Sequence, residues 1–213
     1  MPAVTPREAP ISIRRLRRAE LPLHTAALAR FLVGKIVVRE LSGVRLSGRV
    51  VETEAYPPRD PAAHHFRGPT PRARSMFLSV GHAYVYFSYG NHFMLNVSAE
   101  APGVGGGVLI RALEPLEGIQ QMARNRKTSR LLDLARGPGR LASALRIDRS
   151  LDATDLCAPG PLWLGAMTRP GLPAPAFLLG KSKRIGITRA AHRLLRFYQR
   201  GNPFVSGPRT LRS

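Results

Sequence analysis

The sequence predicts an α+β fold of one domain, with a mixed or antiparallel β-sheet core, surrounding helices and a protruding β-hairpin. Its 213 residues, 44% of them hydrophobic, are enough to bury one good core. A helical pattern near the N-terminus leads into a run of β-branched residues, and a later segment alternates in the manner of a hairpin. We expect residues 1–18, which are rich in arginine, to form a flexible basic arm and residues 19–213 to form the domain.

The first third of the chain is predicted to contain one helix followed by strands. Apolar residues at helical spacing predict a helix over 21–32, which Gly34 ends before a strand over 35–41. Residues 43–56 predict either two antiparallel strands or one bent strand, because turn-forming residues interrupt the run. The proline-rich segment 57–74 has no apolar periodicity and is predicted to be an ordered loop.

Residues 81–98 carry the clearest local pattern in the chain. Tyr84 and Tyr86 fall on one face of an alternating strand, and a second alternating run follows a Gly-Asn turn signal, so the segment is predicted to be a hairpin. Tyr89 and Asn91 lie at its tip. On a basic protein, an aromatic ring at such a tip can insert between bases, or it can fold back on its own hairpin.

The second half of the chain is predicted to consist of short elements. A glycine-rich turn precedes a short apolar strand, and Pro115 marks the start of a helix. The glycine run lacks the lysine of a phosphate-binding loop, so we interpret it as a tight turn. The patterns further predict a basic helix over 119–130, a short helix over 137–147, and closing strands over 183–190 and 196–207 joined by a basic loop.

The charge of the chain predicts a polyanionic partner. Lys and Arg number 33 against 13 Asp and Glu, which gives a net charge of +20 and an isoelectric point near 11.7. A field of this sign attracts nucleic acid or an anionic membrane. Residues 61–99 contain no acidic residue but hold three of the five tyrosines. The cations are mostly arginine, whose planar group suits phosphate, although a bias in base composition explains the ratio equally well.

Several classes of protein do not fit the sequence. The single cysteine, Cys157, excludes an internal disulfide, and the histidines lack the spacing of metal ligands, so we expect neither a metal nor another cofactor. No apolar run reaches the length of a membrane span, and the N-terminus lacks the apolar segment of a signal peptide. We therefore expect a cytoplasmic protein without a membrane partner.

Two glutamates directly before the acid-free stretch are candidates for chemistry. In an extended strand Glu52, Glu54 and Tyr56 share one face and would line one wall. The two acids can be paired with arginines for structure, or one of them can be an acid–base catalyst. In the second case the positive surroundings would keep the carboxylate ionised, and it would act as a base towards water.

Seven segments in the same order resemble the alkyladenine DNA glycosylases, the 3-methyladenine DNA glycosylases of the mammalian type. The resemblance covers the chain from about residue 20 to about residue 206 and implies one DNA glycosylase domain. The segments are VETEAY at 51–56, AAHH at 62–65, TPRARSMF at 70–77, YVYFSYG at 84–90, LNVS at 95–98, LIRALEPLEG at 109–118 and RFYQRGNPFVS at 196–206.

The resemblance implies roles for the matched residues. Glu54 would be the general base that activates the hydrolytic water, and Arg111 with the backbone carbonyl of Ile185 would help to hold that water. Tyr89 would enter the minor groove in place of the extruded nucleotide, and Asn91 stands where some relatives have a bulky apolar residue. Four arginines fall in segments that approach phosphates in the family: Arg72, Arg74, Arg126 and Arg140.

The resemblance also implies a pocket for the flipped base. Tyr56, His64 and Tyr86 would form its aromatic walls, and Asn96 would screen the exocyclic group of the purine. The loop after His64 is one residue shorter than in other members, so either His64 or His65 can supply the imidazole; we favour His64.

The implied function is the repair of DNA. The enzyme would flip alkylated or deaminated purines (3-methyladenine, 7-methylguanine, hypoxanthine or etheno-adenine) out of duplex DNA and hydrolyse the N-glycosidic bond, leaving an abasic site. No lysine falls in the matched pocket segments, so we expect a monofunctional glycosylase without lyase activity. A monomer would suffice for this task. The alternative is a non-catalytic basic protein that binds nucleic acid, which the charge alone would explain.

Overall fold

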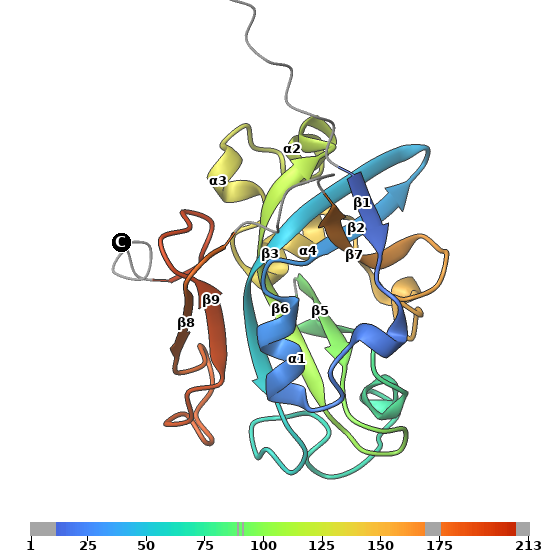
Figure 1. The fold of residues 1–213 in the computed structure, drawn as a ribbon, viewed down its shortest axis with the longest axis vertical. Coiled ribbons are helices and arrows are strands. Elements are labelled where there is room, and N and C mark those ends of the chain that lie inside the picture. The colour runs from blue at the N-terminus through green and yellow to red at the C-terminus, as the bar shows by residue number, and fades with distance from the viewer. Residues whose placement is uncertain (1–11, 89, 91, 169–175, 208–213) are drawn as a thin grey trace, which may run out of the picture.

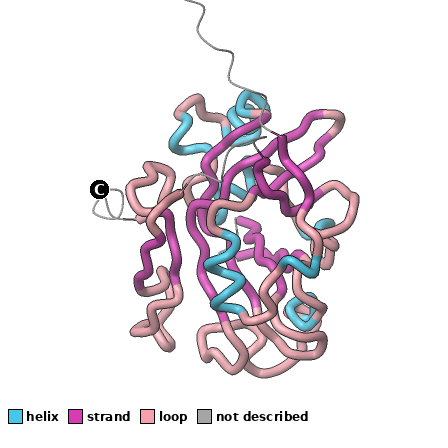
Figure 2. Tube along the Cα trace, in the orientation of Figure 1, coloured by secondary structure: helices cyan, strands magenta, loops and turns pink. Residues whose placement is uncertain are grey.

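A computed structural model describes residues 12–88, 90, 92–168 and 176–207. These residues form one sheet of nine strands with short helices around it (Figures 1 and 2), so the predicted α+β fold is confirmed. The strands are β1 (Ser12–Arg15), β2 (Ile36–Leu41), β3 (Val44–Tyr56), β4 (Ala83–Ser88), β5 (His92–Ser98), β6 (Gly107–Glu117), β7 (Leu162–Thr168), β8 (Leu179–Ser182) and β9 (Arg196–Gln199). The helices are α1 (Thr25–Leu32), α2 (Ile119–Arg126), α3 (Leu131–Leu134) and α4 (Pro138–Ala144), and 3₁₀ turns cover Arg18–Glu20, Arg74–Phe77 and Arg149–Leu151.

Strand β3 is the centre of the sheet. The strand order is β1-β7-β2-β3-β6-β5-β4, and β9 joins β3 beyond the end of β2 while β8 pairs with β9. All of these pairings are antiparallel. Figure 1 shows β3 and β6 running together through the middle of the molecule, with the β8–β9 hairpin at one side. The lower part of the view consists mainly of loops, which Figure 2 shows in pink.

The main hydrophobic core lies where α1 and α4 pack on this sheet. Helix α1 contacts β3 and β6, whereas α4 contacts β5 and β6. The helices contribute Leu28, Leu32 and Leu141, all without exposed surface. Burying one such side chain stabilises the fold by about 1.5–3 kcal/mol. Among the described residues no helix is long and apolar enough to cross a bilayer.

The two predicted helices of the first and middle thirds are shorter than expected. Helix α1 begins at Thr25, because the Glu100 carboxylate accepts hydrogen bonds from the Thr25 amide (2.8 Å) and hydroxyl (2.5 Å). Glu100 therefore satisfies one of the amide groups that a helix start leaves free. Helix α2 ends at Arg126, and Lys127 takes a left-handed conformation with φ of 51° before the separate α3.

The boundary predicted for the N-terminal arm is wrong. Residues 12–15 form β1, which pairs with β7 along its whole length. Leu16 is buried in the core, and the Arg15 guanidinium stacks on the ring of Trp163 at 4.9 Å. The segment is ordered because it pairs with β7 and buries the apolar side chain of Leu16. Its arginine content alone does not predict these contacts. Residues 1–11 lie outside the described residues.

The segment 43–56 is a single bent strand, one of the two predicted alternatives. The turn before it is formed by Ser42 and Gly43, both with positive φ (49° and 80°), as a two-residue hairpin turn requires. The second turn signal, Ser47-Gly48, stays inside β3 at a shift in register. A β-bulge accommodates the irregularity and bends the strand.

The helix start predicted at Pro115 is wrong, because β6 continues to Glu117 and α2 begins at Ile119. Pro115 pairs with Gly48 at the same shift in register. Proline lacks an amide hydrogen and is tolerated in sheets at bulges. A side chain on Gly48 would come within 2.9 Å of the Leu113 Cβ atom, so glycine permits the close pairing of the two strands.

The strand predicted over 183–190 is also wrong, whereas the strand at the start of 196–207 is confirmed as β9. The partner of β9 is β8, which ends at Ser182. Residues 183–195 form the connecting loop, and Gly186 has a φ of 73°. The alternating apolar residues of this loop, Ile185 and Ile187, line the pocket described below and do not pair in a sheet.

The predicted hairpin is confirmed as β4 and β5, with Tyr84 opposite Asn96 and Tyr86 opposite Met94. Its tip residues, Tyr89 and Asn91, lie outside the described residues. Helix α4, predicted over 137–147, packs against β5 of the hairpin.

Gly139→Ala is expected to lower the free energy of unfolding by about 1–3 kcal/mol, the usual cost of overpacking. An added Cβ would lie 2.7 Å from Cγ of His92, which is the first residue of β5. Gly160→Ala is the matched control, because a Cβ there meets nothing within 4 Å. Urea denaturation of both variants measures the difference. Equal stabilities would show that α4 can move away from the hairpin at no cost.

Candidate active site

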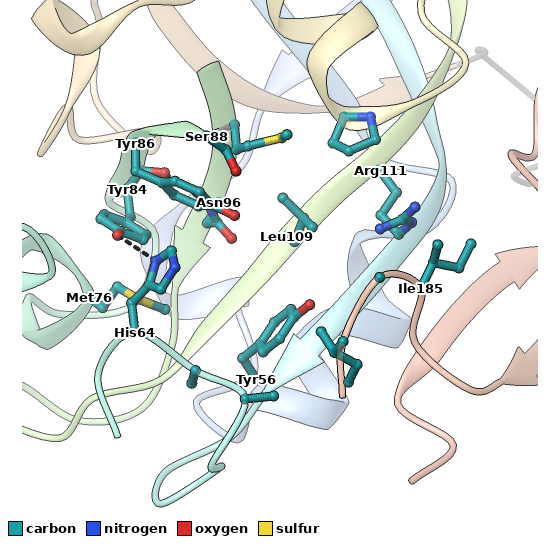
Figure 3. Close-up of a pocket in the computed structure, with 16 residues that line it drawn as sticks. Tyr56, His64, Met76, Tyr84, Tyr86, Ser88, Asn96, Leu109, Arg111 and Ile185 are labelled. Atoms are coloured by element: carbon teal, nitrogen blue, oxygen red, sulfur yellow. Dashed lines mark hydrogen bonds between the residues drawn. The ribbon is translucent and has the colours of Figure 1, made fainter. Parts of the chain in front are cut away.

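A pocket of about 350 Å³ opens between the β4–β5 hairpin, the end of β3 and two loops (Figure 3). The acid-free stretch 61–99 supplies more than half of its lining. The pocket is lined by Tyr56, Ala62, Ala63, His64, Met76, Tyr84, Tyr86, Ser88, Met94, Asn96, Leu109, Arg111, Pro138, Ile185, Gly186 and Ile187.

Three rings gather on one side of the pocket. Tyr84 and Tyr86, from alternate positions of β4, are stacked with centroids 5.3 Å apart, and His64 meets Tyr86 edge-on at 4.5 Å. The Tyr84 hydroxyl lies 2.9 Å from Nδ1 of His64, the dashed line in Figure 3. Burial, together with the charge of Arg72, lowers the pKa of His64 to about 4. The imidazole is therefore neutral at pH 7 and can accept a hydrogen bond from the tyrosine.

His64 and not His65 lines the pocket. His65 is buried behind it, with Nε2 3.1 Å from the Pro57 carbonyl oxygen and its ring edge-on to Phe77. Adjacent residues point in different directions, so one histidine serves the pocket and the other packs the loop. This arrangement agrees with the choice made from the sequence.

Tyr56 lies across the pocket from these rings, with Leu109 behind the space between them (Figure 3). Asn96 lines the pocket and is held by its side-chain amide, which donates to the Tyr84 carbonyl oxygen at 3.2 Å. That bond leaves the side-chain carbonyl oxygen available as an acceptor. The cavity can thus hold a flat ring between aromatic walls, with one polar edge fixed beside it.

Glu54 lies directly behind the pocket wall. Its carboxylate accepts a hydrogen bond from the Tyr56 hydroxyl at 2.9 Å and one from the Ile185 amide at 2.7 Å, and Arg111 Nη1 lies 3.2 Å away. These three residues line the pocket, but the Glu54 side chain has no exposed surface. The expectation that both glutamates line a wall is therefore wrong: Tyr56 does so, and the longer side chains around it cover the acids.

Glu52 has a different environment and is fully paired. It accepts from Nε of Arg111 at 2.8 Å, from Nε of Arg196 at 2.6 Å and from the Ser206 amide at 2.7 Å. The structural alternative for the acid pair therefore applies to Glu52, which is tied into a buried ionic network. A catalytic role for Glu54, which lies one layer from the cavity, stays a prediction.

A double irregularity in the sheet brings Arg111 to both acids. Glu52 pairs with Ala112 but Thr53 pairs with Ile110, so Arg111 is an extra residue on β6. Bulges of this kind re-aim side chains and are frequent beside active sites. Burial lowers the pKa of Arg111, but the Glu54 and Glu52 carboxylates outweigh it and raise the pKa above its ordinary value. The guanidinium therefore remains charged between them.

Tyr56 is held in its protonated form. Burial first, and then the negative charge of Glu54, raises the pKa of its hydroxyl well above the ordinary value. The hydroxyl consequently donates to Glu54 at any physiological pH. For Ile185 the structure shows an amide bonded to Glu54, whereas the role implied for its carbonyl remains a prediction.

The four arginines predicted to approach DNA lie in two places. Arg72 and Arg74 belong to the loop that bears His64; Arg72 stacks over the Tyr86 ring at 5.3 Å, and Arg74 is exposed. Arg126 donates to the Leu134 carbonyl oxygen, and Arg140 pairs with Asp133 at 2.8 Å. Their contacts with phosphates remain predictions, as do the roles of Tyr89 and Asn91.

Sequence reasoning missed several residues of the pocket. Tyr84 shares a strand face with Tyr86, so the alternation could have identified it. Met76, Met94 and Leu109 form apolar parts of the lining, which no spacing in the sequence distinguishes from core residues. No group of three or more His, Cys, Asp or Glu residues suited to a metal occurs in the described part of the chain.

An aromatic pocket in a strongly cationic chain fits the class of enzymes that act on nucleic acid. A family model described as methylpurine-DNA glycosylase (MPG) matches residues 20–203. The chain therefore belongs to the methylpurine-DNA glycosylase family and is a DNA glycosylase, which confirms the resemblance seen in the sequence.

Individual relatives agree with this assignment. A protein of Mesorhizobium japonicum, provisionally named a 3-methyladenine DNA glycosylase, is 64% identical over 197 residues, which are 92% of each chain. A protein of the same name from Paraburkholderia phytofirmans is 50% identical over 92% of this chain and 90% of its own. Another from Koribacter versatilis is 42% identical over 97% of this chain and 100% of its own.

Proposed function

We propose that the protein excises 3-methyladenine and related damaged purines from duplex DNA by hydrolysing the N-glycosidic bond of a flipped nucleotide. The observation that carries the proposal is the Glu54 carboxylate, which three pocket-lining residues hold directly behind the wall of an aromatic cavity. The family membership and the names of the relatives support the same substrate class.

Binding of the damaged base would rely on stacking. A flat purine fits between Tyr56 and the rings across the pocket, and each stacking contact contributes about 1–3 kcal/mol. Flipping costs a few kcal/mol, less for a damaged base than for a well-paired one. Two or three ring contacts are therefore sufficient to hold the flipped base.

Glu54 would act as the general base. A carboxylate offers about four acceptor sites, and the Tyr56, Ile185 and Arg111 contacts occupy three. The remaining site, on Oε2, would bind the proton of a water that attacks the anomeric carbon. Because the Glu54 side chain has no exposed surface, the pocket-lining side chains that cover it would have to move when DNA binds to admit this water. An alkylated purine leaves as a neutral molecule, so proton donation to it is not needed. None of the described residues lining the pocket is a lysine, which favours hydrolysis over lyase chemistry.

Incubation of the protein with methylated duplex DNA, followed by chromatography of the released bases, tests the proposal. We expect release of free 3-methyladenine and an abasic site without strand cleavage by the protein. The alternative, a non-catalytic basic protein, predicts binding that ignores damage and releases no base. Salt titration does not distinguish the two, because both lose affinity as phosphate contacts are screened. No release at enzyme excess would contradict the proposal.

A further inference from the structure

Arg184 is a fully buried cation next to the pocket for which the proposed reaction has no use. Its Nη1 lies 2.8 Å from Oδ2 of Asp60, and its Nη2 donates to Oδ1 of the same carboxylate at 3.1 Å. Nη1 also donates to the Ala55 carbonyl oxygen at 3.0 Å. Neither charged side chain has any exposed surface. A two-pronged pair of this kind fixes a guanidinium in position and direction.

The Arg184 guanidinium lies over the Tyr56 ring, 4.6 Å from its centroid. Tyr56 lines the pocket, but Arg184 does not and is buried. The arginine therefore occupies the face of the ring that points away from the cavity. A base in the pocket and the Arg184 guanidinium would stack on opposite faces of the same tyrosine.

The ion pair also joins the two loops that enclose the pocket. Asp60 belongs to the loop bearing His64, where its carboxylate accepts from the Ala62 amide at 2.9 Å. Arg184 directly precedes Ile185, whose amide bonds to Glu54. In Figure 3 these loops approach the cavity from different sides. The buried Arg184–Asp60 ion pair thus fixes the loop that bears His64 relative to the loop that bears Ile185.

The charge of Arg184 has an electrostatic consequence for a bound base. An aromatic face attracts a cation through its negative quadrupole, by about 0.5–2 kcal/mol. The Arg184 guanidinium, on the face of Tyr56 away from the pocket, polarises the ring electrons towards itself. It also repels a positive charge on the face of the ring that lines the pocket. Arg72 is placed similarly on Tyr86 at 5.3 Å, but it is exposed, so water screens it.

We propose that Arg184 is a positioning residue for base excision that also sets the balance between cationic and neutral damaged bases. The inference rests on the proposed function. With Arg184 in place, Tyr56 attracts a cationic purine less than an unoccupied ring would, while stacking on a neutral purine is unaffected. Removing the charge favours the cationic base over the neutral one.

The test compares two substrates in one preparation. Single-turnover release of 7-methylguanine, which is cationic, and hypoxanthine, which is neutral, is measured for wild type and Arg184→Met. Methionine keeps a long apolar side chain behind the ring. The rate on both bases is expected to fall, but the ratio of 7-methylguanine to hypoxanthine release should rise about three- to tenfold. Partial loss of folded protein lowers both rates equally and leaves the ratio unchanged.

Arg193→Gln is the matched control. Arg193 pairs with the same Asp60 oxygen at 3.2 Å, but its side chain is 42% exposed and it has no contact with Tyr56 among those described. Its ratio is expected to stay within about twofold of wild type. Arg184→Lys keeps the charge without the planar fork, so it should lower both rates and leave the ratio near that of wild type.

Three results would overturn the inference: an unchanged ratio in Arg184→Met, an equal rise in Arg193→Gln, or an equal rise in Arg184→Lys. The first would show that the guanidinium has no electrostatic effect, and the others that the effect comes from Asp60 or from packing alone. A wild-type protein that releases neither of these bases nor 3-methyladenine would instead contradict the proposed function, so the two failures are distinguishable.

Discussion

Glu54→Gln is expected to abolish base release while the protein keeps its fold and its affinity for damaged DNA. The amide oxygen can still accept from Arg111 and the Ile185 amide, and the Tyr56 hydroxyl can turn to accept from the new amide hydrogen. The glutamine cannot take a proton from water. Loss of a general base typically lowers a rate by about 10²–10⁴-fold.

Single-turnover kinetics on DNA containing 3-methyladenine measure the loss, and a binding titration on the same DNA measures affinity. Glu40→Gln is the control, since Glu40 is a half-exposed acid that pairs with Arg45 far along β3 from the pocket. A rate within about tenfold of wild type in Glu54→Gln would exclude general-base catalysis by this residue. Loss of binding would instead mean that Glu54 holds the pocket together.

Glu52→Gln is expected to destabilise the protein by about 3–5 kcal/mol, because removing one partner of a buried ion pair leaves the other charge uncompensated. Here the buried guanidinium group of Arg196 loses the carboxylate with which it pairs, whereas Arg111 keeps its ion pair with Glu54. A loss of this size is a large part of the roughly 5–15 kcal/mol that stabilises a typical domain.

Urea denaturation followed by circular dichroism measures the effect, again with Glu40→Gln as the control. Glu54→Gln measured in parallel should lower the stability less, because Arg111 keeps its ion pair with Glu52 and no guanidinium group is left without a carboxylate. The two substitutions would then have different effects: Glu54→Gln mainly lowers the rate of base release, whereas Glu52→Gln mainly lowers the free energy of unfolding. A change of less than about 1 kcal/mol for Glu52→Gln would show that Arg196 finds other acceptors, such as the Ser206 carbonyl oxygen at 2.7 Å.

The local patterns predicted the hairpin correctly because both of its strands have one face in the core. Tyr84 and Tyr86 could be assigned to one face for this reason, and the structure places both in the pocket. The period of two also placed Glu54 and Tyr56 on one side of β3, where the tyrosine hydroxyl bonds the carboxylate.

The local patterns failed where a contact from elsewhere in the chain changed the outcome. Pro115 begins no helix because Gly48 accommodates it at a bulge. Residues 12–15 form a strand because β7 offers an edge. Residues 183–190 form no strand, and within them Arg184 and Ile185 are bonded to Asp60 and Glu54.

The sequence by itself determined the fold class, the family, the cationic character and the residue types of the pocket, because these follow from periodicity, composition and ordered motifs. Only the tertiary structure decided which glutamate is tied into the core, which histidine faces the cavity and which cation stands behind Tyr56. The partners in these contacts are far apart in sequence, 124 residues in the case of Arg184 and Asp60. Burial and charge pairing between such distant residues depend on the path of the whole chain, which no local pattern encodes.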